Sequence, residues 1–332
     1  MDENNGYHPF RTPLWERLRP TASIGDSDAE NQSPIGLIAG WGRFPVQVAH
    51  AVVASGRPVV CVAITGHADR QLEYICDDVQ WMGVGKLGGH QRYFRQFDVH
   101  TVTMAGKLFK SQLLFRGSVL LRHLPDWMCI KTLAPLLLGK KRDTRDDVLL
   151  TAVTNAYQNN GMNVKPATEL APQLLIDDGL LTHRPPSQRQ QNDAEYGWRI
   201  AKQMGQMDIG QSIAVSDGTV IAVEAIEGTD ACIQRAGKLC PRGGWTLIKT
   251  AKPQQDMRFD VPTIGTQTVD NVADGGGTCI VIESHRTIVV DREATIRRAD
   301  HRGVAILAIR DGAMKNQNNE HPSAVSRLRA VA

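Results

Sequence analysis

The stretch IGLIAGWGRFPVQVAHAVVASG, residues 35–56, decides the fold of the first half of the chain. It begins with a continuous apolar run, which is typical of a strand buried on both faces of a parallel sheet. Residues 45–56 then carry apolar side chains at helical spacing and end at a glycine. A buried strand, a tight glycine turn and a helix in this order predict the repeating unit of a doubly wound α/β domain.

The same alternation continues outward from this unit. Residues 59–65, 79–84 and 99–106 are further apolar runs of strand length, and segments of helix length separate them. From about residue 107 to 159 the apolar pattern becomes helical. These observations predict an N-terminal Rossmann-like domain with a parallel sheet over residues 34–165.

The second half of the chain has a different pattern, which predicts a C-terminal α+β domain over residues 166–310. The run QSIAVSDGTVIAVEA, residues 211–225, surrounds Asp217-Gly218, a dipeptide that strongly favours a two-residue hairpin turn. We expect a second hairpin over residues 279–291, with its turn near His285. Mixed hairpins and short helices are typical of the α+β class.

Three other segments complete this half. Residues 245–252 and 304–309 are strand candidates. The stretch THRPPSQRQQNDA, residues 182–194, is polar and contains two prolines, so it predicts a linker or an exposed loop. A helix is expected directly after it, over residues 195–207.

The composition argues against several classes of protein. The 332 residues include 38 Lys and Arg against 35 Asp and Glu, the net charge is +3, and aromatic residues make up 5%. We therefore expect no nucleic-acid partner, because such proteins usually show a basic excess or stacking aromatic residues. No apolar run has the length of a membrane span, and none of the six cysteines has zinc-site spacing, which favours a cytoplasmic protein. Residues 1–33 and 311–332 lack apolar periodicity and are predicted to be flexible tails.

A glycine turn follows the first strand, at Gly40 and Gly42. Such a turn, opening a helix, is suited to holding a phosphate against backbone N–H groups. Pro45 stands where the dinucleotide fingerprint has its third glycine, and no acidic residue directly ends the second strand, so a standard NAD site is disfavoured. The alternative interpretation of Gly40 and Gly42 is a tight strand–helix turn that binds no ligand.

Two further segments carry charged groups suited to phosphate chemistry. The turn VEAIEGTD, residues 223–230, offers carboxylates for Mg²⁺, or it simply caps a helix that begins near Asp230. Residues 249–265 combine lysines, an arginine, glutamines and aspartates with rigid Pro and Gly positions. That mixture fits a phosphate ester, and a solvated loop with local ion pairs is the alternative.

A leucine-rich segment with mainly basic charges spans residues 107–142. Its composition fits contact with an acyl chain or an anionic membrane surface. A buried helix with basic residues facing solvent has the same composition, and the sequence leaves both interpretations open.

Seven sequence segments, taken together and in their order along the chain, form a recognisable pattern. They are IGLIAGWGRFP (35–45), VTMAGK (102–107), RDDVLLTAV (145–153), DIGQSIAV (208–215), VEAIEGTDA (223–231), AKPQQDMRFDVPTIG (251–265) and VVDRE (289–293). In this arrangement the chain resembles the LpxI-type UDP-2,3-diacylglucosamine pyrophosphatases over about residues 34–310. The EGTDA and RFDVPTIG motifs make the resemblance specific because they are long and unusual.

The resemblance implies a reaction and a setting. The family hydrolyses the pyrophosphate of UDP-2,3-diacylglucosamine to UMP and 2,3-diacylglucosamine 1-phosphate (lipid X), a step of lipid A biosynthesis. It implies a divalent cation, Mg²⁺, and a Rossmann-like domain followed by a distinct C-terminal domain. It also implies a cytoplasmic homodimer that associates peripherally with the inner membrane.

The resemblance also assigns residues by position. The family's essential aspartate falls on Asp260, and the neighbouring motif positions fall on Arg258 and Gln255. Its E-G-T-D run falls on Glu227, Gly228, Thr229 and Asp230. Its glycine turn falls on Gly40 and Gly42, and an acidic pair falls on Asp146 and Asp147. Trp41 departs from the family, in which smaller or polar residues are common.

From these positions we derive a hypothetical mechanism. Asp260, with Glu227 or Asp230, is expected to hold Mg²⁺ against the pyrophosphate oxygens. Arg258 and Lys252 are expected to take the developing negative charge. The predicted catalytic residues are Asp260, Arg258, Asp230 and Glu227, and the predicted substrate-binding residues are Gly40, Gly42, Thr229, Gly228, Gln255 and Lys252.

Three competing functions remain at this point. A nicotinamide oxidoreductase would use the glycine turn, and the missing fingerprint residues argue against it. A non-catalytic nucleotide-sugar or lipid-binding protein would not need the acidic cluster. A pyrophosphatase acting on another nucleotide sugar fits the sequence equally well, because the shape of the acyl groove decides the substrate.

Overall fold

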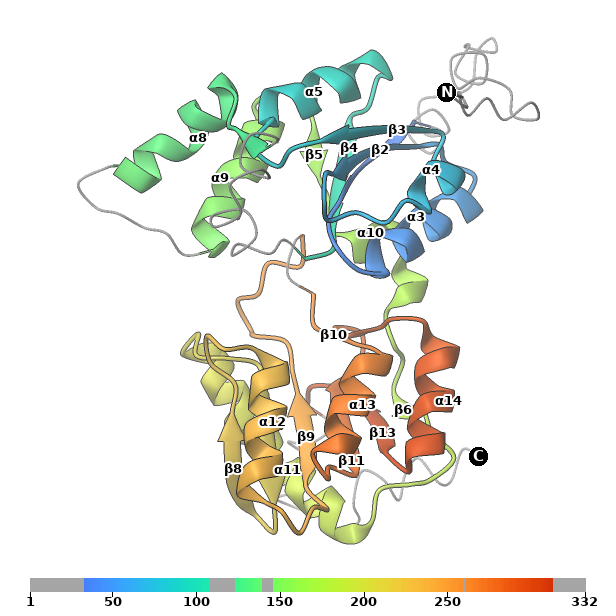
Figure 1. Cartoon of the computed structure of the whole chain (residues 1–332), viewed down its shortest axis with the longest axis vertical. Coiled ribbons are helices and arrows are strands. Elements are labelled where there is room, and N and C mark those ends of the chain that lie inside the picture. The colour runs from blue at the N-terminus through green and yellow to red at the C-terminus, as the bar shows by residue number, and fades with distance from the viewer. Residues whose placement is uncertain (1–32, 108–122, 139–145, 259–260, 313–332) are drawn as a thin grey trace, which may run out of the picture. The chain divides into compact units, whose positions relative to one another are not determined.

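The computed structural model describes residues 33–107, 123–138, 146–258 and 261–312 (Figure 1). The chain forms two compact units, which meet in sequence between Ala171 and Pro172. The predicted tails, except for residues 33, 311 and 312, lie outside the described residues, and so do residues 108–122 and 139–142 of the leucine-rich segment.

The N-terminal unit contains a five-stranded parallel sheet with the order β3-β2-β1-β4-β5. This confirms the predicted parallel α/β fold, because the expected apolar runs become strands. The strands are β1 (Ile35–Ala39), β2 (Val59–Ile64), β3 (Asp78–Met82), β4 (Thr101–Ala105) and β5 (Asn163–Val164).

Helices cover both faces of this sheet (Figure 1). They are α3 (Phe44–Ala54), α4 (Leu72–Ile75), α5 (Leu87–Gln96), α8 (Trp127–Leu138), α9 (Asp146–Gln158) and α10 (Ala167–Leu170). The α5–α8–α9 layer packs on the sheet through a core that includes Phe94, Tyr157 and Val62. Pro45 at the start of α3 suits the first turn of a helix, where its missing N–H costs no hydrogen bond.

The C-terminal unit contains a six-stranded mixed sheet with the order β6-β13-β11-β9-β7-β8. Strands β9, β11 and β13 are parallel, whereas β6, β7 and β8 join through antiparallel pairs. The strands are β6 (Gly179–Leu180), β7 (Ser212–Ser216), β8 (Thr219–Val223), β9 (Thr246–Lys249), β11 (Cys279–Glu283) and β13 (Ala305–Ile309). Two short strands, β10 (Thr263–Ile264) and β12 (Ile288–Val289), form a separate parallel pair.

Helices cover both faces of this second sheet as well. Helix α11 (Gln188–Gln206) packs on one face through Trp198 and Met204. Helices α12 (Thr229–Leu239), α13 (Thr266–Asp274) and α14 (Arg292–Arg302) lie on the other face, over a core centred on the fully buried Trp245 (Figure 1). A short 3₁₀ helix, Pro172–Leu174, opens the unit.

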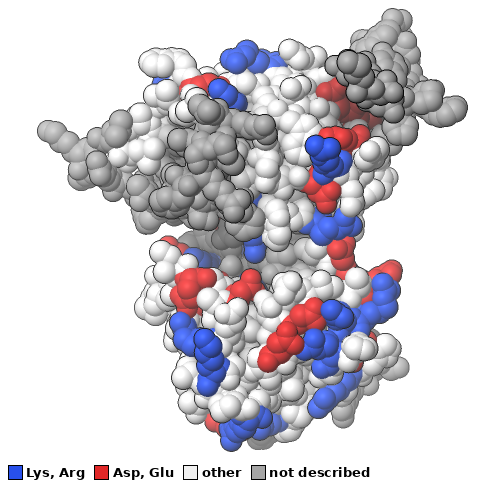
Figure 2. Space-filling view, viewed as in Figure 1, with Lys and Arg blue, Asp and Glu red and all other residues white. Residues whose placement is uncertain are grey.

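The outer surface of α13 and α14 carries interleaved charges of both signs (Figure 2). Asp270 of α13 lies 2.9 Å from Arg298 and 3.3 Å from Arg302 of α14. Asp274 also pairs with Arg302. These contacts tie the two helices together, and each exposed pair contributes at most about 1 kcal/mol.

The hairpin predicted around Asp217-Gly218 is confirmed, because β7 and β8 pair antiparallel across that dipeptide. Both turn residues have a positive φ, 50° and 66°, as a two-residue hairpin turn requires. The second predicted hairpin is wrong. His285 does lie in a turn with φ 56°, but β11 pairs in parallel with β9 and β13, and β12 pairs with β10.

The predicted linker or loop over residues 182–194 is also partly wrong, because α11 begins at Gln188 within it. Ser187 forms a capping box with Gln190: the Ser187 amide donates to the Gln190 side chain at 2.7 Å, and the Ser187 hydroxyl accepts from the Gln190 amide at 3.4 Å. The polar residues of this stretch therefore start a helix.

The described part of the leucine-rich segment includes α8, on which Trp127, Ile130 and Leu137 are exposed. Among the described residues, no helix is both long and apolar enough to cross a bilayer.

Candidate active site

The C-terminal unit gathers its predicted site segments at one edge of its sheet. Strands β9 and β11 end there, and ligands of α/β sheets usually bind at the carboxyl ends of parallel strands. Strand β8 ends at the same edge, because Val223 pairs with Ile213, which in turn pairs with Ile248 of β9. The EGTD turn (residues 227–230) and the loop that follows β9 therefore emerge side by side.

A buried polar cluster lies behind the EGTD turn. The Lys249 Nζ of β9 donates to the Thr229 hydroxyl at 2.7 Å, and that hydroxyl donates to Glu224 Oε1 at 3.0 Å. Ser212 Oγ lies 3.4 Å from the same hydroxyl. Lys249 is 5% exposed and Glu224 is 7% exposed. Because a hydroxyl has one proton, Thr229 cannot donate a second hydrogen bond to a substrate in this arrangement.

Glu224 and Lys249 of this cluster also influence the pKa of Cys232 in the neighbouring helix α12. Glu224 Oε2 is buried and has no hydrogen-bond partner among the residues that the structure describes. Burial raises the pKa of the Cys232 thiol to about 12, with a further increase from Glu224 and an opposing decrease from Lys249. Cys232 is thus an inert thiol that lies within the electric field of both charged groups.

Two predicted carboxylates of the EGTD turn lie on its exposed side. Glu227 pairs with Arg235 at 2.8 Å, and Asp230 accepts from the Asn271 amide at 2.9 Å. A hydrogen bond from its own backbone amide, together with Arg235, holds the pKa of Glu227 below its usual range. Helix α12 begins at Thr229 with Gly228 as its N-cap, and a glycine has no side chain with which to cap it. The alternative, that the turn provides a side-chain cap from Thr229 or Asp230, is therefore wrong, because Gly228 occupies the N-cap position.

The loop after β9 brings three predicted residues together with local partners. Lys252 Nζ lies 2.7 Å from Asp208, and the Lys252 amide donates to the Gln255 side chain at 2.9 Å. Arg258 forms a bidentate contact with Asp256, which holds the pKa of Asp256 below its usual range. Phe259 and the predicted essential Asp260 lie outside the described residues.

The predicted magnesium ligands do not form a metal site by themselves. Within residues 33–107, 123–138, 146–258 and 261–312, no group of three or more His, Cys, Asp or Glu side chains is placed to hold a metal ion. Glu227 and Asp230 have the partners described above, and Asp260 is not described. The described donor set alone does not fit Mg²⁺, which prefers several oxygen ligands.

In the glycine turn of the N-terminal unit, Gly40 allows close packing of the backbone against residues 105–107. The Gly40 amide donates to Ala105 at 2.8 Å, and Trp41 and Lys107 exchange two backbone hydrogen bonds at 2.8 and 3.0 Å. A Cβ at Gly40 would stand 2.8 Å from the Lys107 carbonyl oxygen. Gly42 differs, since its φ of 106° requires glycine and its surroundings are open. Asp146 and Asp147 open α9.

The sequence matches the two domain profiles of one known protein family. Residues 34–174 match the profile of the LpxI N-terminal domain, and residues 177–307 match that of the LpxI C-terminal domain. The chain belongs to the LpxI family. It is 33% identical over 283 residues to the "UDP-2,3-diacylglucosamine pyrophosphatase LpxI" of Caulobacter vibrioides, and the match covers 83% of this chain and 97% of that protein.

The sequence predicts Glu224 as one of three carboxylates suited to Mg²⁺ and Lys249 as part of the charged segment 249–265, but it does not predict that the two residues meet at Thr229 in the candidate LpxI site. Lys249 stands in the otherwise apolar run WTLIK of β9, and Glu224 directly follows β8. A lysine within a buried strand is unusual, because it must be paired inside the protein. The lysine at the end of this apolar run is the sequence feature that indicates a paired, buried Lys249.

Proposed function

We propose that this protein hydrolyses the pyrophosphate of UDP-2,3-diacylglucosamine to UMP and 2,3-diacylglucosamine 1-phosphate. The observation that carries the proposal is the 33% identity to the Caulobacter pyrophosphatase across 97% of that protein's length. The profiles of both LpxI domains match in the same order. The reaction belongs to lipid A biosynthesis.

The geometry of the C-terminal unit supports a phosphoanhydride substrate. Hydrolysis of such a bond depends mainly on positioning and on stabilising negative charge. Lys252 and Arg258 lie on the loop after β9. We propose that they bind the pyrophosphate oxygens. In this structure the carboxylates of Asp208 and Asp256 occupy the positions next to these cations that the substrate's anionic oxygens would take. Gln255, which holds the Lys252 amide, keeps this part of the loop in place.

The EGTD turn contributes a second set of groups. The Thr229 hydroxyl is already committed to Glu224, so Gly228 and Thr229 would bind substrate through the backbone at the start of α12. Asp260, Glu227 and Asp230 are the proposed acidic groups of the reaction. We propose Asp260 as the essential one from its place in the family motif.

Mg²⁺ is the proposed cofactor. Bound by Asp260 with Glu227 or Asp230, it would neutralise charge on the pyrophosphate. Removal of divalent ions with EDTA should abolish turnover, and Mg²⁺ should restore it. Activity that persists in EDTA would remove the metal from the proposal.

The decisive experiment incubates the purified protein with UDP-2,3-diacylglucosamine and Mg²⁺ and identifies the products by mass spectrometry. Release of UMP and the sugar phosphate by the wild type, and none by Asp260→Ala, supports both reaction and site. Asp274→Ala, which removes an exposed carboxylate paired with Arg302, is the matched control and should retain activity. Near wild-type activity of Asp260→Ala would refute the site.

Two other outcomes point to the alternative functions. Substrate that binds without product release would favour a non-catalytic binding protein. Absence of both binding and release would favour another nucleotide sugar. Hydrolysis in ¹⁸O-water locates the attack: label in the sugar phosphate supports attack on the phosphorus nearer the sugar, and label in UMP contradicts it.

The cellular setting is also a proposal. We propose a cytoplasmic homodimer that meets its lipid substrate at the inner membrane, with the leucine-rich segment as one wall of the acyl groove. Light scattering tests the dimer and vesicle flotation tests membrane association. Replacing Trp127 or Leu137, which are exposed on α8, should raise KM for the diacyl substrate but not for a deacylated analogue.

A further inference from the structure

The Glu283 carboxylate is buried at the carboxyl end of β11, next to the start of the loop that follows β9. It is 1% exposed. The parallel register pairs Ile282 with Lys249, the last residue of β9. Glu283 is one residue further along β11 and therefore lies beside the chain that follows β9. A buried carboxylate is strongly destabilising unless several donors satisfy it.

Three elements supply those donors. Lys202 of α11 donates to both carboxylate oxygens at 2.8 Å, and the backbone amide of Ala251 donates to Oε2 at 2.8 Å. Arg286 lies 3.9 Å from Oε1, and its other nitrogen donates to the Lys252 carbonyl at 3.3 Å. Glu283 and Arg286 therefore hold the backbone of Ala251 and Lys252, near the start of the loop.

We propose that Glu283 is a positioning residue for the loop over residues 251–258, which holds Lys252, Gln255 and Arg258 in a geometry competent for binding the pyrophosphate. This inference rests on the proposed function. The loop has no regular secondary structure of its own, so its starting direction depends on these contacts. A displacement of about 1 Å at reacting groups can reduce a rate about 100-fold.

The Glu283→Gln variant isolates this role because it keeps the size of the side chain. A glutamine has one acceptor oxygen where the carboxylate has two. It cannot serve both Lys202 and Ala251 without turning its NH₂ group toward one of these donors. We expect kcat/KM to fall by about 10- to 100-fold and the amide hydrogens of the loop to exchange faster.

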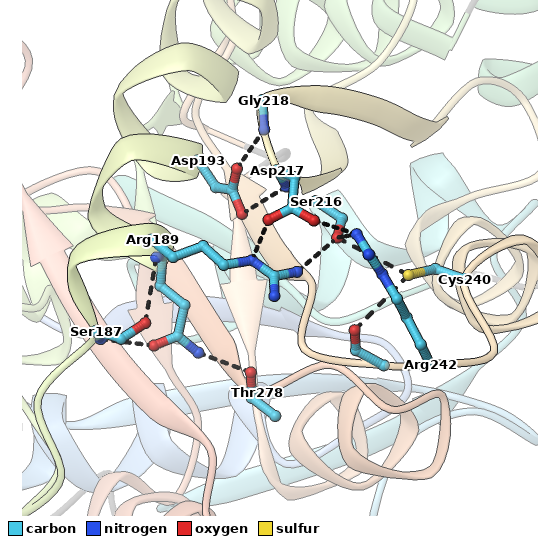
Figure 3. A network of polar contacts seen from close by, with 11 residues as sticks. Ser187, Arg189, Asp193, Ser216, Asp217, Gly218, Cys240, Arg242 and Thr278 are labelled. Carbon is cyan, nitrogen blue, oxygen red and sulfur yellow. Dashed lines mark hydrogen bonds and ion pairs between the residues drawn. The ribbon is translucent and has the colours of Figure 1, made fainter.

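The same unit offers a matched control at the opposite edge of the sheet. Asp193 is also 1% exposed, and its carboxylate accepts from the backbone amides of Asp217 at 3.2 Å and Gly218 at 2.7 Å (Figure 3). The hairpin that Asp193 holds lies at the other end of the strands, about 20 Å from Glu283, because about six residues along the strand direction separate the two positions. Asp193→Asn removes one acceptor in the same way, so it should lower stability without changing kcat/KM.

The experiment measures product release, thermal stability and hydrogen exchange for the wild type, Glu283→Gln and Asp193→Asn, below the melting temperature of each. A fall in kcat/KM and faster loop exchange confined to Glu283→Gln support the proposal. Equal losses in both variants, or no loss in Glu283→Gln, would overturn it. If Glu283→Gln does not fold, Lys202→Met, which removes a partner of the same carboxylate, replaces it.

Failure of the proposed function can be distinguished from failure of this inference. If the wild type does not hydrolyse UDP-2,3-diacylglucosamine, the function fails, and hydrogen exchange still decides the inference. Faster exchange over residues 251–258 in Glu283→Gln alone then supports the positioning role. Unchanged exchange overturns it.

Discussion

Replacing Lys249 with methionine should strongly destabilise the C-terminal unit. Methionine fills much of the same space but removes the ammonium group that donates to Thr229 at 2.7 Å. Glu224, which is 7% exposed, would lose the nearby ammonium group and keep only the Thr229 hydroxyl as its donor. Lys249 and Glu224 are linked through the shared Thr229 hydroxyl, and removing one partner of a buried charge pair typically costs about 3–5 kcal/mol, which we take as the upper range for this linked pair. For a unit of this size the melting temperature should fall by about 6–20 °C.

A double-mutant cycle with Glu224→Gln tests the reasoning. Removing both charges leaves no uncompensated ion, so the double variant should be more stable than the sum of the single effects predicts, by about 1–3 kcal/mol. Unfolding free energies are measured from the urea dependence of hydrogen exchange in peptides of β7 and β9, which report on this unit alone. Lys252→Met is the matched control: its partner Asp208 is 53% exposed, so the cost should stay below about 1 kcal/mol. Single effects that simply add in the double variant would refute the coupling of the two charges through Thr229.

Two further predictions concern the stability of each unit. Burial lowers the pKa of His90 to about 4, below its usual 6.5, so the stabilising effect of the neutral ring is complete above about pH 6.5 and is lost as the pH falls toward 4. The N-terminal unit should lose about 3 kcal/mol over this range, measured by urea unfolding, and His90→Gln should lack that loss; an unchanged pH profile would contradict the assignment. Gly277→Ala should cost the C-terminal unit about 1–3 kcal/mol, because the added Cβ would stand 2.6 Å from Val272 and 2.8 Å from Trp245. Gly89→Ala, in a helix with contacts of 3.4 Å or more, should instead raise the melting temperature, and a similar loss in both variants would refute the steric explanation.

Local patterns predicted much of the fold. The apolar run and glycine turn at residues 35–56 became β1 and α3, and Asp217-Gly218 became the turn between β7 and β8. Both predictions rest on short-range physics, in which a few neighbouring residues determine the backbone. The capping box of Ser187 and Gln190 is equally local and gives the true start of α11.

The hairpin over residues 279–291 was mispredicted for a different reason. The run CIVIE has no polar alternation, and every residue of β11 is buried. Such a run is typical of a central parallel strand, whose neighbours are distant in sequence. The turn at His285 is real, but a turn alone does not determine which strands pair.

The candidate site shows the same limit. The EGTD motif predicts acidic groups at the start of a helix, and they lie there. Their partners, Arg235 and Asn271, come from α12 and α13, and Lys249 comes from β9. Only the folded sheet brings these side chains together, so spacing along the chain could not predict which carboxylates are engaged.

The pairing of β6 with β13 determines where the chain enters and leaves the C-terminal unit. Leu180 lies opposite Leu307 and Gly179 opposite Ala308, so the first and last strands of the unit are neighbours. A domain whose ends meet in this way can be excised, inserted into another protein or circularly permuted with little disturbance of its core. The second half of this protein therefore has the architecture of a transferable module.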